Sequence, residues 1–397
     1  MLTFKTLEIK CLFGYAGRVL YVDLNTGKTR TEKLSEETAK KYIGGIGLGM
    51  HFYLSNSKTE TAPLSPENPL ILALGPLAGT MFPTGGNGHA FISKSPQTGG
   101  VAEAVSHGTF GTELKRAGYD VVIITGQAKN PVYLWIDDNT IKLSDASHLW
   151  GKSPGETEDH LKEELGDYYI RVAAIGLAGE KQSKIANIIN DKTQAASRTG
   201  LGAVMGSKNL KAIAVRGTHD VAVAKPVEFM ELVQDFHERM KGPATSKYRT
   251  IGSIENITTN NNLVCMPTYN YEVAQFPNVD KISGEVLNEH YVTKIIACNS
   301  CAMRCEHEAL IRDGVYKGTM TRIEYDSIWA LGPNCGVDQP NFIIKAIERC
   351  FYYGLDPQSV GVTISFVMDC HEHGVLSQEC LDGVDAHFGN AHAVVSL

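Results

Sequence analysis

Pro69-Leu-Ile-Leu-Ala-Leu74 runs directly into Gly75-Pro-Leu-Ala-Gly79-Thr80, and this stretch indicates the architecture of the first half of the chain. The first six residues are a short apolar run, which predicts a buried β-strand, and the glycines that follow predict a tight turn. A glycine-rich turn after a strand can present backbone N–H groups to a phosphate, but ordinary β domains contain similar turns. The turn does not end in Gly-Lys-Ser/Thr, so it is not a Walker A motif.

Further apolar runs on both sides of this stretch predict more strands. The predicted strands are residues 18–24, 120–125, 132–136, 170–175 and 210–215. Ser35 is a plausible N-cap for a helix in the same half. After about residue 220 the apolar residues take helical spacing, over residues 228–241, 341–353 and 360–371. We therefore expect an α+β protein, with an extension over 1–13, a β-rich domain over 14–220 and a mostly helical domain over 221–397.

Composition narrows the class of protein. The chain has 397 residues, of which 43% are hydrophobic and 20% charged, as in an ordinary globular protein. A net charge of −7 argues against a nucleic-acid partner. No run reaches the ~18 apolar residues that a membrane span needs. The nine cysteines are mostly widely spaced and do not suggest a disulfide framework, so we expect a reducing, cytoplasmic compartment.

Cys298, Cys301 and Cys305 form a C-x2-C-x3-C run that can converge on one face of a short loop-helix. Thiolates favour iron–sulfur clusters or zinc, and a cubane cluster needs a fourth ligand from elsewhere. The paired C-x2-C of a zinc ribbon is absent. The spacing favours an iron–sulfur centre; zinc and a set of reduced cysteines are the alternatives.

Three other patterns contain residues that could bind a cofactor or a metal ion or exchange protons. Residues 198–208 hold three glycines with one Arg and one Lys, which suits either an anionic cofactor or a packing loop. Glu324 and Asp326 stand beside aromatic residues, where a carboxylate can exchange protons near neutral pH or simply form salt bridges. His371 and His373 flank Glu372, and an extended metal-ligand pair is less expected there than solvated histidines at a helix end.

Together these runs resemble the tungsten-dependent aldehyde:ferredoxin oxidoreductase family. The resemblance is collinear from about residue 14 to the end, and its segments include Gly17-Arg-Val-Leu-Tyr-Val-Asp-Leu-Asn-Thr-Gly27, the cysteine run and Glu324-Tyr-Asp-Ser-Ile-Trp-Ala-Leu-Gly332. The other matching segments are residues 42–49, 63–68, 75–80, 83–86, 94–99, 110–115, 117–120, 145–151, 174–180 and 202–212.

The resemblance implies a fold, cofactors and roles. It implies a β-rich base domain that holds a tungsten (or molybdenum) bis-pterin, with Mg²⁺ bridging the pterin phosphates, and a helical domain that carries a [4Fe–4S] cluster. The implied pterin contacts are Gly86, Asn87, Val105, Ser106, His107, Gly108, Gln194, Ala195, Ala196 and Arg198. Asp326 and Glu324 are the implied catalytic residues, and Cys298, Cys301 and Cys305 the implied cluster ligands. Residues 105–108 and 194–198 should then be neighbours in space, and the three sulfurs should converge.

The implied reaction oxidises a small aldehyde to a carboxylic acid and passes the electrons to ferredoxin or a similar carrier.

The chain departs from the family pattern at Asn87 and Gln194, where arginines are common, and at Asp326, where a Glu is usual. Family members are longer, so we expect the last third, with the fourth cluster cysteine, to be absent. The expected protein partners are a second copy in a homodimer, or a separate C-terminal chain that would complete the fold. The alternatives are a tungsten subunit of a larger reductase, a truncated non-catalytic fragment and a zinc-binding structural protein.

Overall fold

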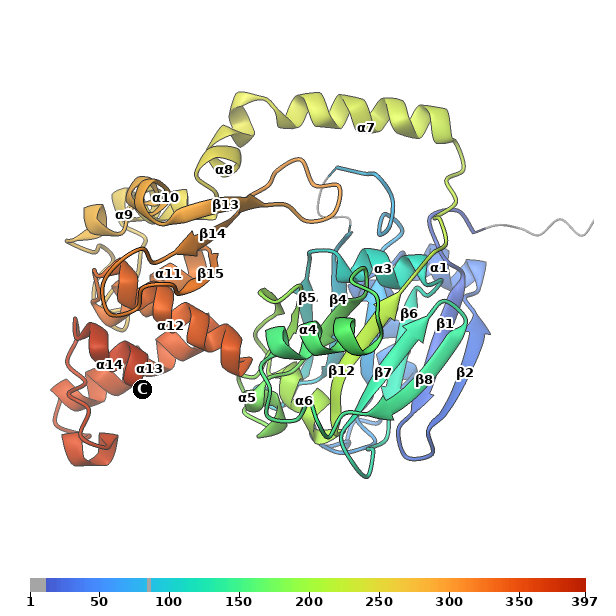
Figure 1. The fold of residues 1–397 in the computed structure, drawn as a ribbon, viewed down its shortest axis with the longest axis horizontal. Helices are drawn as coiled ribbons and strands as arrows, with labels where there is room; N and C mark the ends of the chain where they lie inside the picture. Colours follow the sequence, from blue (N-terminus) through green and yellow to red (C-terminus); the bar gives the residue numbers. More distant parts are fainter. Residues whose placement is uncertain (1–11, 84–86) are drawn as a thin grey trace, which may run out of the picture.

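Two β-sheets build the first half of the molecule, and helices with a small sheet build the second half (Figure 1). The computed structural model describes residues 12–83 and 87–397. The predicted extension over residues 1–13 therefore lies almost wholly outside the described residues. Within the described ranges, no helix is both long enough and apolar enough to cross a membrane.

The first sheet has six strands in the order β2-β1-β6-β3-β4-β5, and all its pairs are antiparallel except β1 with β6. Its strands are β1 (Arg18–Asp23), β2 (Lys28–Lys33), β3 (Leu70–Leu74), β4 (His89–Lys94), β5 (Val101–Ser106) and β6 (Val121–Thr125). The second sheet also has six strands, in the order β11-β10-β9-β12-β7-β8. Its strands are β7 (Val132–Asp137), β8 (Thr140–Asp145), β9 (Arg171–Ala174), β10 (Ile188–Asn190), β11 (Gln194–Ala196) and β12 (Leu210–Arg216).

The two sheets share one apolar core, which explains the unbroken apolar sequence of β3. Leu72 of β3 and Ile213 of β12 both belong to this core. The neighbouring residue Ile71 points the opposite way, into a second core under the helices α1 (Glu36–Tyr42) and α2 (Ile46–Asn56). A strand that is buried on both faces has no polar side, so it loses the alternation that a half-exposed strand shows.

The remaining helices of this half close the sandwich. They are α3 (Phe110–Arg116), α4 (Pro154–Glu164), α5 (Leu177–Glu180) and α6 (Leu201–Ser207). Leu161 of α4 covers the outer face of the second sheet. Every residue of α6 is buried, so the glycines of that segment allow close packing. Ser35 caps α1 by accepting a hydrogen bond from Thr38 N, as the sequence predicted.

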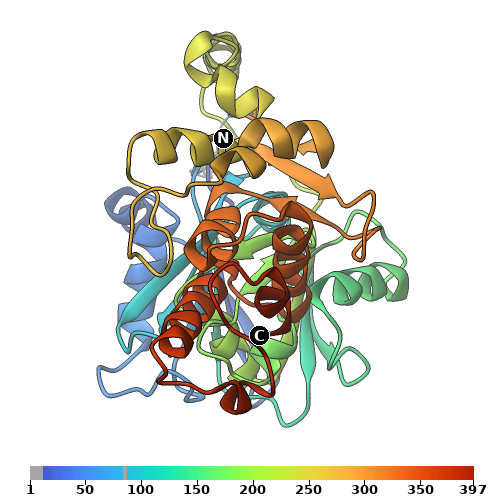
Figure 2. The same cartoon turned by 90° about the vertical axis from the view of Figure 1, so that its left-hand side faces the viewer.

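The second half is mostly helical and packs against one end of the sandwich (Figure 2). Its α-helices are α7 (Pro226–Met240), α8 (Ser246–Thr250), α9 (Asn256–Asn262), α10 (Gly284–His290), α11 (Tyr325–Leu331), α12 (Pro340–Tyr353), α13 (Pro357–Glu372) and α14 (Ala391–Ser396). Short 3-10 turns occur at Pro243–Thr245, Ser253–Glu255, Val279–Lys281, Pro333–Cys335 and Gln378–Leu381. A single apolar core holds this half together and also includes Ile189 of β10.

The α+β class and the strand and helix positions named above are confirmed. Several strands were not predicted. In the two large sheets these are β2, β4, β5, β8, β10 and β11. The helical half also contains an unpredicted antiparallel sheet of β13 (Val292–Ile296), β14 (Glu306–Leu310) and β15 (Met320–Ile323). β14 begins Glu-His-Glu and has no apolar run, whereas the β-branched residues of β13, Val-Thr-Lys-Ile-Ile, are a strand signal that was missed. The cysteine run lies in the loop between β13 and β14 and contains no helical turn, so the expected loop-helix was wrong. The domain boundary near residue 220 stays a prediction.

Candidate active site and cysteine loop

A polar cavity of about 290 Å³ opens where the two halves of the molecule meet. It is lined by Val105, Ser106, His107, Gln194, Ala195, Ser197, Arg198, Glu306, Arg322, Glu324, Asp326, Ser327, Asp356, Pro357 and Gln358. The first seven of these come from the β-sandwich, at the ends of β5 and β11, and the rest come from the helical half. The cavity therefore exists only when both halves are docked.

The two predicted pterin-binding segments lie side by side in this cavity, so their predicted proximity is confirmed. Asn190 joins them: its Oδ1 accepts a 2.6 Å hydrogen bond from Ser106 Oγ, its Nδ2 donates one of 2.9 Å to the His107 carbonyl, and its backbone is paired with Gln194 between β10 and β11. Gly108 ends the first segment at φ +84°, and a Cβ there would lie 2.2 Å from Asp191 Oδ2. Only glycine fits at this position, because both the backbone conformation and the space exclude a side chain.

A buried ion-pair network forms the wall between the cavity and the cysteine loop. Arg322 Nη1 lies 3.0 Å from Glu306 Oε1, and Arg322 Nη2 lies 3.6 Å from Glu324 Oε1. The Gln194 amide donates to the other oxygen of Glu306. Arg322 Nε is buried without a hydrogen-bond partner. The network thus contains one buried donor whose hydrogen-bonding capacity is not used within the described residues.

Two further carboxylates in the cavity have raised pKa values. Burial raises the pKa of Asp326, in the first turn of α11, and nearby Glu324 raises it further, against the opposing effect of Arg198. Burial also raises the pKa of Asp356, although its bonds to Ser359 and the Arg198 charge oppose this. Arg198 Nε lies 3.7 Å from Asp356 Oδ2, and its Nη1 donates to Gln358. Such carboxylates can hold or release a proton closer to neutral pH than an exposed Asp can.

The cysteine loop is fastened to the β-sandwich beside the cavity. Asn299 N donates a 3.1 Å hydrogen bond to the Gly108 carbonyl, directly after the first pterin-binding segment. The Asn299 carbonyl accepts a 2.7 Å bond from Asn87 Nδ2, and Ala302 N donates a 3.1 Å bond to the Pro83 carbonyl. A centre held by this loop would therefore lie next to a ligand in the cavity.

The three thiols of the loop are close enough to influence one another. Burial raises the pKa of Cys298 to about 12, and Glu306, Cys301 and Cys305 each add to the shift. Burial and then Glu306 raise the pKa of Cys305, and Cys301 adds to it. Buried thiolates that repel each other are unfavourable unless a cation lies among them, and metal binding releases their protons. The donor set and its surroundings fit an iron–sulfur centre.

Three of the predicted cofactor residues that the structure describes, Asn87, Gly108 and Ala196, do not line the cavity. Asn87 is buried, and its Oδ1 accepts bonds from Gly79 N at 2.9 Å and Thr112 Oγ1 at 3.0 Å, while its Nδ2 holds the cysteine loop. The Gly108 carbonyl accepts the hydrogen bond from Asn299 N. Ala196 points into the core between the sheets. Gly86 lies outside the described residues.

Glu306, Arg322 and Asp356 line the cavity but were not among the predicted site residues. Asp356 is the N-cap of α13 and is followed by Pro357, and this Asp-Pro start of a helix is a local signal from which it could have been found. Arg322 and Glu306 carry no local signal, because they meet only through the pairing of β14 with β15. Because that small sheet was not predicted, the ion pair between Glu306 and Arg322 could not be predicted either.

The cavity offers the mixed donors and acceptors that a phosphate-bearing pterin requires. The Arg198 guanidinium and polar groups of residues 105–107 can donate, while Asp326 and Asp356 can accept or share a proton. The residues present therefore fit such a group.

Family sequence models decide the relationship of the chain to known proteins. The model of the aldehyde ferredoxin oxidoreductase N-terminal domain matches residues 19–217, and the model of domains 2 and 3 of the same enzymes matches residues 231–397. The chain belongs to the aldehyde ferredoxin oxidoreductase family. This confirms the resemblance drawn from the sequence motifs.

Individual relatives agree with this membership. The chain is 41% identical over 392 residues to the tungsten-containing aldehyde ferredoxin oxidoreductase of Pyrococcus abyssi, covering 96% of the chain and 63% of that protein. It is 30% identical to the WOR-like subunit of an aliphatic sulfonate oxidoreductase of Pyrococcus furiosus, covering 97% of the chain and 64% of that subunit.

Among solved structures, the active site complex BamBC of benzoyl coenzyme A reductase with 1,5-dienoyl-CoA is similar, with a TM-score of 0.84 and 28% identity. The match covers 97% of this chain and 59% of that one. This member of the aldehyde ferredoxin oxidoreductase family thus spans about 63% of the length of the curated relatives it matches most strongly.

Proposed function

We propose that this chain forms the pterin-binding and cluster-binding part of an oxidoreductase that converts an aldehyde to a carboxylic acid. The observation that carries the proposal is the shared position of the cavity and the cysteine loop, joined by the Asn299–Gly108 hydrogen bond. The reaction is R–CHO + H₂O → R–COOH + 2 e⁻ + 2 H⁺. When bound, a tungsten–pterin group supplies two-electron and oxygen-transfer chemistry, and an iron–sulfur cluster supplies one-electron transfer.

In this proposal the protein's own residues bind the cofactor and handle protons. Arg198 and polar groups of residues 105–107 bind its anionic groups, and Gln194 is oriented by its bond to Glu306. Asp326 receives and releases a proton at its carboxylate, for which its raised pKa is suited. Glu324, held near Arg322, keeps the proton on Asp326 by its negative charge.

Cys298, Cys301 and Cys305 hold a [4Fe–4S] cluster in the proposal, and ferredoxin or a similar small carrier takes the electrons. The described cysteines are all free, which supports a reducing, cytoplasmic compartment. A zinc-binding structural role is not favoured by the family membership. The choice of tungsten over molybdenum and the bridging Mg²⁺ remain predictions.

A second candidate is a role within a larger reductase assembly. The relatives from Pyrococcus furiosus and from benzoyl coenzyme A reductase are named as a subunit and as part of a complex. In that case the carrier would be a partner chain rather than free ferredoxin. Copurification of a stable electron-transfer subunit with this chain would favour this candidate.

Metal content of the anaerobically purified chain tests the proposal. We expect tungsten together with roughly four iron ions per chain, and iron should fall in a Cys301→Ser variant. Asp326→Asn should retain both metals while slowing aldehyde-dependent reduction of a viologen dye in the complete enzyme. Asp280→Asn, at an exposed position, is the matched control and should change neither. A chain that takes up zinc but neither iron nor tungsten would overturn the proposal.

A further inference from the structure

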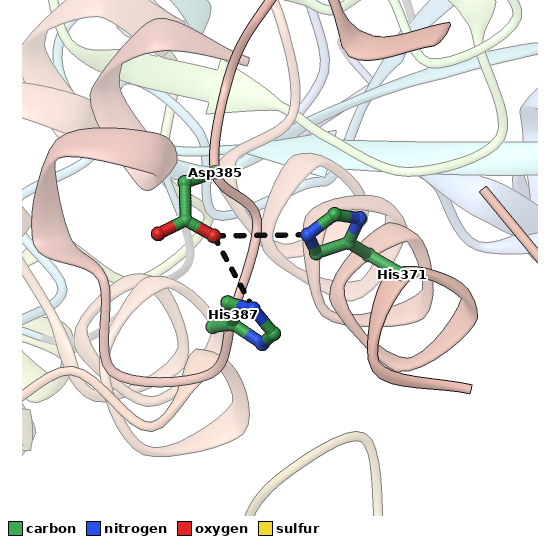
Figure 3. Close-up of side chains that lie close together, drawn as sticks. All are labelled: His371, Asp385 and His387. Carbon is green, nitrogen blue, oxygen red and sulfur yellow. Dashed lines mark ion pairs between the residues drawn. The ribbon is translucent and has the colours of Figure 1, made fainter. Parts of the chain in front are cut away.

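Three metal-ligating side chains meet at the C-terminal end of α13, in the loop that leads to α14 (Figure 3). His371 lies in the last turn of α13, and Asp385 and His387 lie in the following loop. His371 Nε2 is 3.7 Å from Asp385 Oδ1, and His387 Nε2 is 3.4 Å from the same oxygen. One ligand atom from each residue lies within 4.8 Å of the others.

The hydrogen bond of His371 fixes which ring nitrogen faces Asp385. His371 Nδ1 lies 2.9 Å from the Leu376 carbonyl, which can only accept, so Nδ1 carries a proton. In a neutral imidazole, Nε2 then presents its lone pair to the Asp385 carboxylate. Two electron-rich atoms face each other stably only when a proton or a cation lies between them.

The second imidazole is also held from behind. His387 Nδ1 lies 3.7 Å from Glu372 Oε1, the oxygen that accepts a 2.9 Å hydrogen bond from Phe388 N. Metal-bound histidines usually have their other nitrogen held by a carbonyl or a carboxylate in this manner, because that contact sets the tautomer and the ring orientation. His371 has a carbonyl hydrogen bond of this kind, whereas the Glu372 carboxylate faces His387 Nδ1 at ion-pair rather than hydrogen-bond distance.

The loop that carries Asp385 and His387 is well anchored. Ala386, between them, is fully buried, and the Phe388 ring packs edge-on against Tyr269 with 5.6 Å between centroids. Asn390 Nδ2 donates a 2.6 Å hydrogen bond to the Asp385 carbonyl. The alternation of exposed and buried residues therefore directs both ligating side chains to the same side, toward α13.

We propose that His371, Asp385 and His387 bind a divalent transition-metal ion of the zinc class, with the two imidazole ligand atoms, now within 4.8 Å of each other, closing around the ion. Zinc–ligand bonds of about 2.0–2.1 Å at tetrahedral angles place ligand atoms roughly 3.3 Å apart. The contacts of 3.4 and 3.7 Å are close to that value. Two imidazoles with one carboxylate select zinc or a similar ion over Ca²⁺ and Mg²⁺, which prefer all-oxygen sites.

His373 is not part of the proposed site, although it is the nearest other histidine in the sequence. Its Nδ1 lies 2.9 Å from the Asp369 carbonyl and 3.1 Å from the Asp369 carboxylate. The bound ion would instead link the end of α13 to the loop before α14. Its role is to stabilise that loop, and a water or one further ligand completes the tetrahedron.

Cobalt binding to the metal-free 397-residue chain tests the site, because Co²⁺ replaces zinc and reports its ligands by absorption. We expect one Co²⁺ site without sulfur-to-cobalt charge transfer, which separates it from metal bound at the cysteine loop. His387→Ala should weaken this site by about 10–100-fold or more, the loss typical of disturbed metal sites. His373→Ala is the matched control and should leave it unchanged.

A stability measurement covers the case in which His387→Ala folds poorly. Zinc should raise the melting temperature of the chelator-treated wild type and of His373→Ala, but not of Asp385→Asn, an isosteric change at an exposed position. Equal cobalt spectra and equal zinc stabilisation in wild type and Asp385→Asn would overturn the proposal and leave an imidazolium–carboxylate pair. These outcomes do not depend on iron or tungsten, so the proposed function can fail or succeed separately.

Discussion

Asn299, in the cysteine loop, donates its backbone N–H to the carbonyl of Gly108, at the end of the predicted pterin-binding strand, over 3.1 Å. This hydrogen bond joins the two halves of the molecule at the point where two redox centres are proposed to meet. The Asn299 carbonyl is in turn bound by Asn87, so the same residue is held from both sides. The cysteine loop is therefore held against the β-sandwich by one backbone hydrogen bond and one from a buried side chain.

Asn87→Ala should lower the free energy of unfolding by about 1–3 kcal/mol, because it leaves buried polar groups of Gly79 and Asn299 without partners. Urea denaturation of the metal-free chain measures this. Asn299→Ala is the control, since Asn87 contacts only its backbone carbonyl, and it should have little effect. Equal losses of stability in the two variants would show that the hydrogen bonds of the Asn87 side chain do not hold the cysteine loop.

Arg322→Met should destabilise the fold by roughly 3–5 kcal/mol, the usual cost of breaking a buried ion pair from one side. The change leaves Glu306 and Glu324 without their shared counter-charge. Adding Glu306→Gln should recover part of the loss, because it removes one of the uncompensated charges. Additive losses in the double variant would contradict this coupling.

His89 should make the protein sensitive to acid. Burial, and then the nearby His107 charge, lower its pKa from 6.5 to about 3 in the folded state, and neither ring nitrogen has a hydrogen-bond partner. The unfolded chain thus binds a proton between pH 6.5 and 3 that the folded chain does not. Stability is full above pH 6.5 and falls as the pH drops, by about 2 kcal/mol from this residue at pH 5.

Substitution of His89 by Phe checks the pH effect. The ring lies 5.0 Å from Phe110 and 5.7 Å from Phe91, so an apolar ring should be tolerated there. Denaturation at pH 7 and pH 5 should show a smaller stability difference in His89→Phe than in the wild type. His160→Gln, on the surface, should keep the wild-type difference.

Gly252→Ala should disturb the cysteine loop. A Cβ at this position would lie 2.3 Å from His307 Nδ1 and 2.7 Å from the Cys305 carbonyl, and the backbone has φ +81°. Gly374→Ala is the matched control, with φ +70° and no atom within 4 Å of the added carbon. Both substitutions should lower the free energy of unfolding by about 1 kcal/mol, because alanine disfavours the left-handed backbone conformation. Only Gly252→Ala should also reduce iron uptake.

Much of the fold could be predicted from local patterns. The apolar run of β3 and the Ser35 cap of α1 act over a few residues, so the sequence reveals them directly. The strand β14 escaped prediction because its sequence, Glu-His-Glu-Ala-Leu, is polar at the start and matches a loop. Its pairing depends on partners that the sequence does not reveal.

His371 illustrates the same limit at a site. Its nearest histidine in the sequence is His373, but two residues on a helix are about 200° apart around the axis and cannot share one ion. The partner is His387, which reaches His371 only because Ala386 is buried between two exposed neighbours.

By itself the sequence determined the strongly apolar strands such as β3, the long helices α7, α12 and α13, the cysteine spacing and the family, since these depend on residues that are close along the chain. Only the tertiary structure decided the cavity, because its lining comes from β5, β11, β14, α11 and α13, which meet when the two halves dock. It also decided that Arg322 forms an ion pair with Glu306 and that the Asn87 side chain binds the cysteine loop at Asn299. The physical reason is that a buried polar group takes whichever partner folding brings within reach, and its distance along the chain does not matter.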